Sequence, residues 1–344
     1  MSRRNIAVIG GGSFGTVIAN ILAMNGCNVH FWMRSETLAC QVNELHQNTQ
    51  YLPDYDLHPR VVASNDMASV VKGCDMVFVA IPSTSFRQVV RQMQPFLEAN
   101  TILVTTTKGI EADTFLLMSQ ILEQETTDCL IGVLSGPNLA KEIAAKQLTA
   151  TVIASVHERV RVQVKNTLKS AYFKVYTSGD MFGVELGGSL KNIYAIIAGI
   201  AAAKGMGHNT NSMLVTRSLA EMARFGRELG ADPMTFLGLA GVGDLIVTCS
   251  TPLSRNYRVG FALGEGKTLE QATLSIGQVV EGVNTVKLVK HRADELNVYM
   301  PLTTGLYQVL YEKASIKDLV TSLMLSEQAL DVEFAVSHEK NNYD

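Results

Sequence analysis

The chain contains 344 residues, of which 47% are hydrophobic and 18% are charged, and its formal net charge is −3. This composition excludes an intrinsically disordered protein. The length is sufficient for two domains and a large hydrophobic core. The small net charge argues against a nucleic acid or a membrane surface as partner, although local basic residues could still bind a small phosphate.

The cysteine and histidine patterns exclude further classes of protein. The five cysteines are scattered and form no C-x-x-C pair, which indicates free thiols in a reducing compartment. The seven histidines lack the spacing of metal ligands, so we expect no metal site. Glycines interrupt the apolar run after Arg4 too early for a signal peptide, and residues 193–203 are about half as long as a membrane-spanning helix. We therefore expect a cytoplasmic protein without a membrane segment.

A glycine-rich turn follows the first expected strand. Residues 6–9 are apolar and lead into Gly10-Gly-Gly-Ser-Phe-Gly15, after which a helical pattern begins. A strand, G-x-G-x-x-G and a helix in this order indicate a nicotinamide or flavin dinucleotide. Gly10 allows the tight turn, Gly12 lets the backbone approach a pyrophosphate, and Gly15 lets the helix pack on the strand. Free N–H groups at the helix start then face the phosphates. The alternative is a glycine turn that binds another ligand or none.

The residue after the second expected strand bears on the choice of cofactor. Residues 29–33 form this strand, and Arg34 follows it. An acidic side chain at this position would favour NAD by accepting from the ribose 2′-hydroxyl. An arginine can instead pair with a 2′-phosphate. We therefore expect NADPH or NADH as cofactor, with NADP(H) preferred; the alternative is a solvated surface arginine.

The first half of the chain alternates between strand and helix patterns. This alternation predicts an α/β fold with an N-terminal Rossmann-like doubly wound sheet over residues 1–183. Residues 48–59 are expected to be a loop because they contain two prolines and several turn formers. Further strands are expected at residues 76–81, 101–104, 130–134, 150–154 and 173–176, and helices at residues 37–45, 86–96, 160–168 and from about residue 114.

Polar residues follow two of these strands. Lys108 lies just beyond the strand at residues 101–104, and Ser135-Gly-Pro-Asn138 follows the strand at residues 130–134. Ligands bind at the carboxyl ends of the strands in open α/β sheets. Lys108 is therefore expected to contact substrate or cofactor, the alternative being a surface lysine in a turn. The helix after Asn138 offers a second N-terminus for an anion or a carbonyl oxygen.

Helical patterns dominate from about residue 182, which predicts an all-α substrate and catalytic domain at residues 184–344. Residues 184–203 are apolar nearly all round, which is typical of a buried helix, and they contain Lys191. Because burying an ammonium group is costly, Lys191 should lose proton affinity unless a carboxylate compensates. Such a lysine can donate and accept a proton near neutral pH. The alternative is a lysine whose head reaches water.

The rest of the second half contains a candidate phosphate site. Ser254-Arg-Asn256 combines a charged guanidinium fork with a neutral amide donor, which suits a phosphate, although such surface pairs are common. Residues 204–211 are expected to be a glycine-rich loop, residues 212–225 a helix, and residues 240–249 a loop that leads into a short helix.

These pieces together resemble the bacterial type of NAD(P)-dependent glycerol-3-phosphate dehydrogenase over nearly the whole chain. The resemblance implies interconversion of sn-glycerol 3-phosphate and dihydroxyacetone phosphate, mainly as reduction for glycerophospholipid biosynthesis, by a homodimer. The matching motifs are Gly10-Gly-Gly-Ser-Phe-Gly15, Tyr51-Leu-Pro53, Thr107-Lys-Gly109, Ser135-Gly-Pro137, Gly187-Gly-Ser-Leu-Lys-Asn192, Ala240-Gly-Val-Gly-Asp244, Ser254-Arg-Asn256 and Gly277-Gln-Val-Val-Glu281.

The resemblance also assigns roles to residues. Lys191 matches the general acid/base, and Lys108 matches a lysine that touches substrate and cofactor. The remaining catalytic and substrate-binding matches are Asp244 and Thr248 around the lysine, Ser254, Arg255 and Asn256 at the phosphate, and Gly136 and Asn138 in the loop over the substrate. The cofactor contacts would be Ser13, Phe14, Arg34, Lys108, Ala140, Arg255, Val279 and Glu281. Phe14 departs from the Trp or Tyr that relatives often carry, and Asn138 from their Thr or Ser.

Two other functions remain open from the residues. A hydroxyacid or 6-phosphogluconate type of dehydrogenase also places a lysine and an asparagine near the nicotinamide, but a carboxylate substrate would need no phosphate site at Arg255 and Asn256. A non-catalytic nucleotide sensor would need no proton donor such as Lys191.

Overall fold

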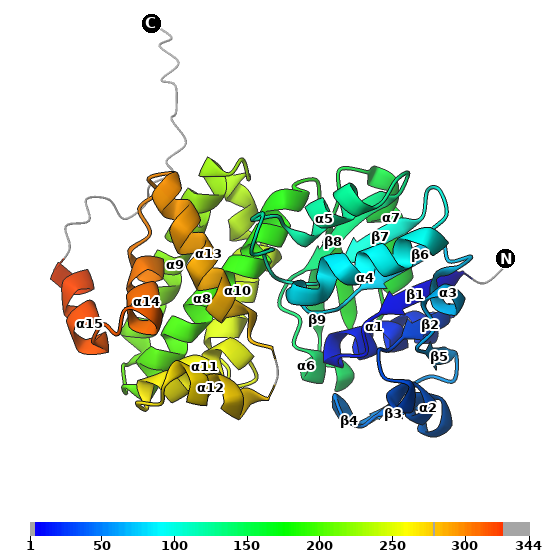
Figure 1. Cartoon of the computed structure of the whole chain (residues 1–344), viewed down its shortest axis with the longest axis horizontal. Helices are drawn as coiled ribbons and strands as arrows, with labels where there is room; N and C mark the ends of the chain where they lie inside the picture. The colour runs from blue at the N-terminus through cyan, green and yellow to red at the C-terminus, as the bar shows by residue number, and fades with distance from the viewer. Residues whose placement is uncertain (1–3, 278, 326–344) are drawn as a thin grey trace, which may run out of the picture.

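The computed structural model describes residues 4–277 and 279–325. Figure 1 shows a sheet covered by helices, followed by a bundle of helices. Residue 278, within the motif that ends at Glu281, and residues 326–344 lie outside the described part. The strands are β1 Asn5–Ile9, β2 Asn28–Trp32, β3 Gln47–Asn48, β4 Leu52–Asp56, β5 Val61–Ser64, β6 Met76–Val79, β7 Ile102–Thr105, β8 Leu130–Ser135, β9 Thr149–Ala154 and β10 Phe173–Ser178.

The helices fall on both sides of the last strand in the sequence. Before it come α1 Ser13–Met24, α2 Glu36–Leu45, α3 Met67–Val71, α4 Phe86–Met93, α5 Met118–Glu125, α6 Ala140–Ala144 and α7 Glu158–Leu168. After it come α8 Met181–Ala203, α9 His208–Glu228, α10 Asp244–Cys249, α11 Arg255–Gly264, α12 Leu269–Ile276, α13 Glu281–Glu295, α14 Pro301–Tyr311 and α15 Ile316–Leu325. Short helical turns precede α4, follow it and precede α10, at Ser83–Ser85, Gln94–Phe96, Pro233–Leu237 and Leu239–Gly243.

The main sheet confirms the predicted doubly wound architecture. Its strand order is β10-β9-β8-β7-β6-β1-β2-β5. The chain moves outward from β1 to β5 and then returns to β6, so its direction across the sheet reverses between β1 and β6. A crevice at such a switch point is where α/β sheets bind ligands. Neighbouring strands are parallel except β8 and β9, which are antiparallel, so β9 and β10 run against the rest.

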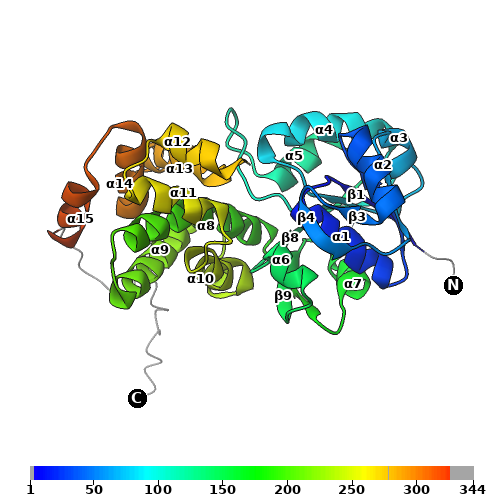
Figure 2. The ribbon, with the colours of Figure 1, turned by 90° about the horizontal axis from the view of Figure 1, so that it is seen from below.

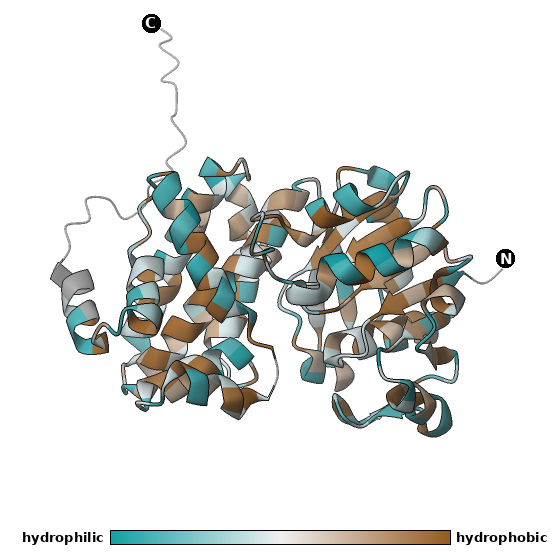
Figure 3. Cartoon of the chain, in the orientation of Figure 1, coloured by the Kyte–Doolittle hydropathy of each residue, from teal (hydrophilic) through white to brown (hydrophobic). Residues whose placement is uncertain are grey.

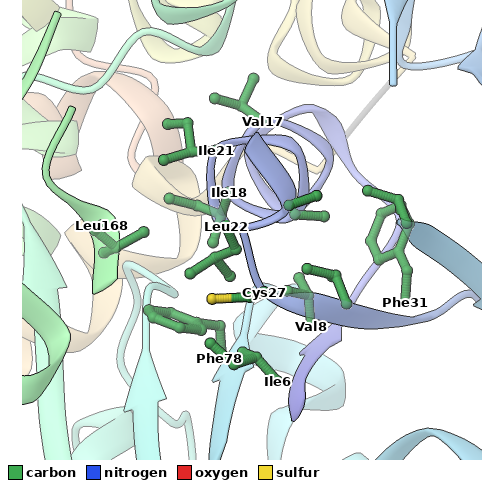
Figure 4. Close-up of a cluster of buried hydrophobic side chains, with 14 of the residues drawn as sticks. Ile6, Val8, Val17, Ile18, Ile21, Leu22, Cys27, Phe31, Phe78 and Leu168 are labelled. Carbon is green, nitrogen blue, oxygen red and sulfur yellow. The ribbon is translucent and has the colours of Figure 1, made fainter. Parts of the chain in front are cut away.

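Successive side chains of a strand point to opposite faces of the sheet, and both faces are apolar. Ile6 and Val8 of β1 pack against α1 and α7, whereas Ala7 and Ile9 pack against α3, α4 and α5. Figure 4 shows the first cluster, in which α1 side chains meet those of the strands and Leu168. The hydropathy colouring of Figure 3 shows the apolar strands inside and more polar turns on the outer face of α4.

The prediction of a loop at residues 48–59 is partly wrong. Strands β3 and β4 form a small antiparallel hairpin there, in which Gln47 pairs with Asp56 and Asn48 with Leu52. Figure 2 shows β4 beside α1. The amide of Asn20 on α1 donates to the Asp56 carbonyl oxygen at 3.1 Å and accepts from the His58 N–H at 2.7 Å. Polar contacts with α1 therefore hold this hairpin, together with the buried side chains of Leu52 and Leu57.

Other boundaries also differ from the expectation. The loop expected at residues 204–211 ends at Gly207, because α9 begins at His208. The helix expected from about residue 114 begins at Met118, and the sequence did not predict β5 or α3. These elements are only four or five residues long, too short for their periodicity to be distinctive.

Helix α8 belongs to both hydrophobic cores. Its first residues, including Met181 and Val184, pack in the core of the sheet, whereas Leu186 and Leu190 pack in the core of the helices. The helix is long and apolar enough to cross a membrane, but 83% of its most apolar window is buried inside the protein. Two glycines allow its closest contact: a Cβ added at Gly199 would lie 2.1 Å from the Tyr257 carbonyl oxygen, and one at Gly260 would lie 1.9 Å from that of Ile196.

Candidate active site

The turn between β1 and α1 has the steric properties that its glycines predict. Gly10 has a φ of +119°, and a Cβ added there would lie 2.4 Å from the Ala80 carbonyl oxygen. A Cβ at Gly15 would lie 2.0 Å from the Gly10 carbonyl oxygen. A Cβ at Gly12 would meet no atom of the described residues within 4 Å, and no side chain caps α1 there. The turn therefore presents open backbone and the first N–H groups of a helix, as a pyrophosphate site requires.

Lys108 lies at the same edge of the sheet, just beyond β7. Its ammonium donates to the carbonyl oxygen of Gly136, which follows β8, at 3.1 Å. It also donates to Oδ2 of Asp244, at the start of α10, at 2.6 Å. Lys108 is therefore not a free surface lysine, because it joins two strand ends to the helical part of the chain.

Asp244 is completely buried and accepts hydrogen bonds from two lysines. Lys191 donates to its Oδ1, while Lys108 occupies Oδ2. The Lys191 ammonium also donates to the hydroxyl of Thr248 at 2.7 Å, and this hydroxyl donates to the main-chain carbonyl of Asp244 at 2.5 Å. The structure thus brings together the four residues that the resemblance assigns to catalysis.

Two ammonium groups share one carboxylate, so this cluster has an excess of positive charge. An ammonium has three N–H donors. Lys108 and Lys191 each use two of them, and neither third donor has a partner among the described residues. Burial and, to a smaller extent, the nearby Lys108 lower the pKa of Lys191 to about 7, against the opposing effect of Asp244. The cluster can therefore offer donors and a titratable proton to a ligand oxygen.

Two glycines of α8 explain how Lys191 reaches the edge of the sheet. A Cβ added at Gly188 would lie 2.6 Å from Oγ of Ser135 and 3.6 Å from the side chain of Lys108. A Cβ at Gly187 would lie 2.9 Å from the Ala240 carbonyl oxygen. Larger residues would push α8 away from the strand ends.

The candidate phosphate site lies at the start of α11. Ser254 is the N-cap residue and accepts from the Tyr257 N–H at 3.3 Å. Arg255 is exposed and donates to the carbonyl oxygen of Val279 at 2.9 Å. Val279, expected at the cofactor, is itself exposed. These contacts place the guanidinium beside the segment before α13.

Asn256 is buried and connects three helices. Its Nδ2 donates to Oδ1 of Asn192 on α8 at 2.9 Å, and its Oδ1 accepts from the N–H of Gly282 on α13 at 3.0 Å. Asn192 is the neighbour of Lys191 in the sequence. The candidate phosphate site is therefore connected to the lysine cluster through one amide pair.

Glu281, at the start of α13, contacts the sheet directly. Its Oε1 accepts from the Ser83 N–H at 3.0 Å, and its Oε2 accepts from the Ser83 hydroxyl at 2.5 Å. Ser83 follows β6, and Oε2 would lie 3.2 Å from a Cβ at Gly109 after β7. Glu281, expected as a cofactor contact, therefore lies at the ligand edge of the sheet. It connects the start of α13 to the segments that follow β6 and β7.

The remaining predicted residues surround this edge. Phe14 on α1 and Ala140 at the start of α6 are partly buried against the sheet core, and Arg34 is exposed just after β2. Ser13 donates its hydroxyl to the Tyr51 carbonyl oxygen at 2.8 Å. Asn138 donates to the Thr151 hydroxyl at 2.9 Å, while its buried Oδ1 has no partner among the described residues.

Sequence reasoning assigned no role to three residues at this edge. Ser83 lies two residues after the end of an expected strand, so its position at this edge was predictable, but its partner Glu281 is 198 residues away. Asn192 was visible only as part of a motif. Asn48 had no signal because its segment was expected to be a loop. Within residues 4–277 and 279–325, His, Cys, Asp and Glu form no group of three that could hold a metal ion.

Comparisons with known proteins agree with the geometry. Residues 5–161 match the family model for the N-terminus of NAD-dependent glycerol-3-phosphate dehydrogenase, and residues 180–321 match that for its C-terminus. Glycerol-3-phosphate dehydrogenase [NAD(P)+] of Saccharophagus degradans is 55% identical over 96% of this chain and 93% of its own. That of Acinetobacter baylyi is 53% identical over 97% of this chain and 94% of its own.

Solved structures give the same result. The crystal structure of glycerol-3-phosphate dehydrogenase from Coxiella burnetii has a TM-score of 0.90 and 35% identity, and the alignment covers 94% of this chain and 99% of that chain. The structure of D-mandelate dehydrogenase with NADH is 13% identical with a TM-score of 0.56, which shows a shared fold alone.

Proposed function

The chain belongs to the NAD-dependent glycerol-3-phosphate dehydrogenase family and is an NAD(P)-dependent oxidoreductase, and we propose that Lys191 is its general acid and base. It interconverts sn-glycerol 3-phosphate and dihydroxyacetone phosphate, and reduction supplies the backbone of glycerophospholipids. One observation carries the assignment of Lys191: its buried ammonium shares Asp244 with a second lysine at the ligand edge of the sheet.

The dinucleotide turn fits a nicotinamide dinucleotide because Gly12 is open and the start of α1 is uncapped. When bound, the reduced nicotinamide supplies hydride to the ketone carbon. Arg34 is exposed where a 2′-phosphate would lie, which supports a preference for NADP(H). The residues that would hold the cofactor are Gly10, Gly12, Ser13, Phe14, Gly15, Arg34, Lys108, Ala140, Arg255, Val279 and Glu281.

Lys191 would donate the proton that the ketone oxygen needs. Negative charge develops on this oxygen as its carbon is reduced, and an ammonium with a remaining N–H both stabilises the charge and supplies the proton. Because burial brings the pKa of Lys191 to about 7, the ammonium and the amine are both available near neutral pH. In oxidation the neutral amine accepts the alcohol proton. Lys108 would add a second donor, while Asp244 and Thr248 orient the Lys191 ammonium.

The substrate phosphate would bind at the start of α11. Arg255 supplies charge, Ser254 and Asn256 supply polar groups, and the helix N-terminus favours an anion. Binding this remote group would position the carbonyl at Lys191. Gly136 and Asn138 would lie over the substrate, and the unpartnered Oδ1 of Asn138 is suited to accept a hydrogen bond from a substrate hydroxyl.

Three features of organisation complete the proposal. Residues 1–183 would form the dinucleotide-binding domain and residues 184–344 the substrate and catalytic domain. The enzyme would work as a homodimer in the cytoplasm, where the five free cysteines would stay reduced.

Absorbance of the reduced nicotinamide tests the role of Lys191. Purified protein is mixed with dihydroxyacetone phosphate and either NADPH or NADH. Replacing Lys191 by methionine (Lys191→Met) should lower kcat roughly 10²- to 10⁴-fold because the proton donor is lost. Lys204→Ala, at the exposed end of the same helix, is the matched control and should keep normal kcat.

The other outcomes separate the alternatives. Near-normal kcat in Lys191→Met would remove the acid–base role. A wild type that binds NADPH but turns over only hydroxy acids would support the hydroxyacid dehydrogenases, and binding without any turnover would support the sensor. Arg255→Ala should chiefly raise KM for dihydroxyacetone phosphate, and an unchanged KM would remove its phosphate role.

A further inference from the structure

The β3–β4 hairpin is attached to the dinucleotide turn, although neither the expected fold nor the catalytic roles account for it. The motif Tyr51-Leu-Pro53 lies in this hairpin. Two residues of the hairpin contact the turn. The Tyr51 carbonyl oxygen accepts from the Ser13 hydroxyl, and the amide of Asn48 donates to Gly11 and Thr16. The deeper of these contacts is that of Asn48, which is completely buried.

The amide of Asn48 begins a relay of hydrogen bonds across the turn. Its Nδ2 donates to the Gly11 carbonyl oxygen at 2.8 Å and to the Thr16 hydroxyl at 2.8 Å. The Thr16 hydroxyl in turn donates to the Gly12 carbonyl oxygen at 2.8 Å. Since this hydroxyl has one proton and uses it on Gly12, it must accept from Asn48. The chemistry therefore fixes the orientation of the amide, with both Nδ2 hydrogens in use.

This relay fixes the direction of two N–H groups. A peptide unit is planar, so the carbonyl of one residue determines where the N–H of the next residue points. Holding the Gly11 carbonyl fixes the N–H of Gly12, and holding the Gly12 carbonyl fixes the N–H of Ser13. These N–H groups are among the first of α1, at the N-terminus where phosphates bind.

We propose that Asn48 is a positioning residue for the cofactor, which holds the Gly11 carbonyl directly and orients the Thr16 hydroxyl on the Gly12 carbonyl, so that the following N–H groups face the pyrophosphate. The proposal rests on the dinucleotide site described above. It concerns the pyrophosphate, which NADPH and NADH share, and not the ribose end where Arg34 lies. A contact that shapes the shared part must change the affinity for both cofactors by the same factor.

Asn20, on α1, provides a matched control for contacts with the same hairpin. It is 3% exposed, compared with 0% for Asn48, and it also makes two hydrogen bonds with the hairpin region. Its partners are Asp56, the last residue of β4, and His58 just after it, and neither bond involves the Gly11 or Gly12 carbonyl. Loss of Asn20 should therefore loosen the hairpin without releasing the Gly11 and Gly12 carbonyls.

Fluorescence titration with NADPH and NADH tests the proposal in wild type and in the variants Asn48→Ala, Asn48→Asp, Asn20→Ala and Arg34→Ala. Asn48→Ala should raise Kd for both cofactors by the same factor, roughly 10- to 50-fold for two lost hydrogen bonds. Asn48→Asp keeps the shape but places a carboxylate against two acceptors, so its effect should be at least as large. At saturating NADPH, KM for dihydroxyacetone phosphate should stay within about twofold in these variants, because the substrate lies elsewhere. Arg34→Ala should weaken NADPH alone.

Three results would overturn the proposal. Kd could stay unchanged in both Asn48 variants, the loss could differ between NADPH and NADH, or Asn20→Ala could raise Kd as much as Asn48→Ala. If Asn48→Ala does not fold, the isosteric Asn48→Asp carries the same comparison. A wild type that binds neither cofactor would reject the dinucleotide site itself, and this result is separate from any difference among variants.

Discussion

Two ionic clusters, one at the active site and one on the surface of the sheet domain, contain similar groups in different surroundings. In the first, Lys108 and Lys191 share Asp244, whose side chain is 1% exposed. In the second, Arg87 pairs with Glu111 and Glu125, and Arg91 pairs with Glu125. The first cluster has two cations for one carboxylate, whereas the second has two for two.

Burial and charge balance together explain their different electrostatics. Burial and the second lysine bring the pKa of Lys191 to about 7, which suits proton transfer. In the surface cluster, hydrogen bonds from Arg91 and then Arg87 lower the pKa of Glu125 to about 2, so every group stays charged near neutral pH. The comparison shows that an unbalanced, buried cluster is suited to chemistry, and a balanced, partly exposed one to holding elements together.

The largest effect is expected from removing the shared carboxylate. Asp244→Asn keeps the shape but leaves the buried Lys191 ammonium facing the partly buried Lys108 without a carboxylate between them, so the pKa of Lys191 should fall further. We expect kcat for reduction at pH 7 to fall roughly 10²- to 10³-fold, as for loss of a preorganised electrostatic partner. The pH profile of kcat is the measurement, and its descent should move to lower pH. A profile that keeps its wild-type position would contradict the role given to Asp244.

The wild-type enzyme should show opposite pH dependences in its two directions. Reduction needs the ammonium of Lys191, so its kcat should fall above about pH 7, by up to about tenfold per pH unit. Oxidation needs the neutral amine, so its kcat should fall as the pH drops below about 7. Steady-state kcat at saturating substrate, measured in each direction on both sides of pH 7, provides the test. Parallel slopes in both directions would indicate that another group controls the rate.

The surface cluster should affect stability and leave catalysis unchanged. Arg87→Ala leaves Glu111 and Glu125 without their shared partner and should lower the free energy of unfolding by about 1–2 kcal/mol, with kcat unchanged. The pKa of Glu125 is lowered in the folded state, so its contribution is present above the unfolded value of 4.5 and is lost as the pH falls towards 2. Denaturant unfolding at pH 7 and pH 3 measures both effects.

Arg91→Ala is the matched variant with the smallest expected effect. Its side chain is 63% exposed and, within the described part of the chain, pairs with Glu125 alone, so the unfolding midpoint should shift by less than about 2 °C. A shift as large as that of Arg87→Ala would mean that the cluster acts as one cooperative network, and a lowered kcat in either variant would remove the contrast with the active site.

The sequence predicted the elements with a strong periodicity and the residues whose chemistry is unusual for their position. The apolar strands and the glycine turn after Ile9 are local patterns, and Lys191 is conspicuous because an ammonium in an apolar helix needs an explanation. Partnerships between distant residues were not predictable, because Lys108 and Asp244 are 136 residues apart and meet only after both halves have folded. The reversal of β9 and β10 also leaves no local signal, because the hydrophobic pattern of a strand does not depend on the direction in which it runs in the sheet.

The hairpin over the dinucleotide turn was missed for a different reason. Its strands are short, one contains Pro53 and Asp54 with a φ of +61°, and its residues are mostly exposed. The buried amides of Asn20 and Asn48 hold it, and only a few of its side chains, such as Leu52, reach the core. Patterns of hydrophobicity cannot reveal an element that side-chain hydrogen bonds secure.

Helix α8 contributes Met181 and Val184 to the core of the sheet and Leu186 and Leu190 to the core of the helices. Melting either core therefore removes packing from the other through the same few turns of helix. The consequence is cooperative unfolding: in calorimetry the two halves should melt in a single transition, and neither half should persist as a stable folded fragment without the other.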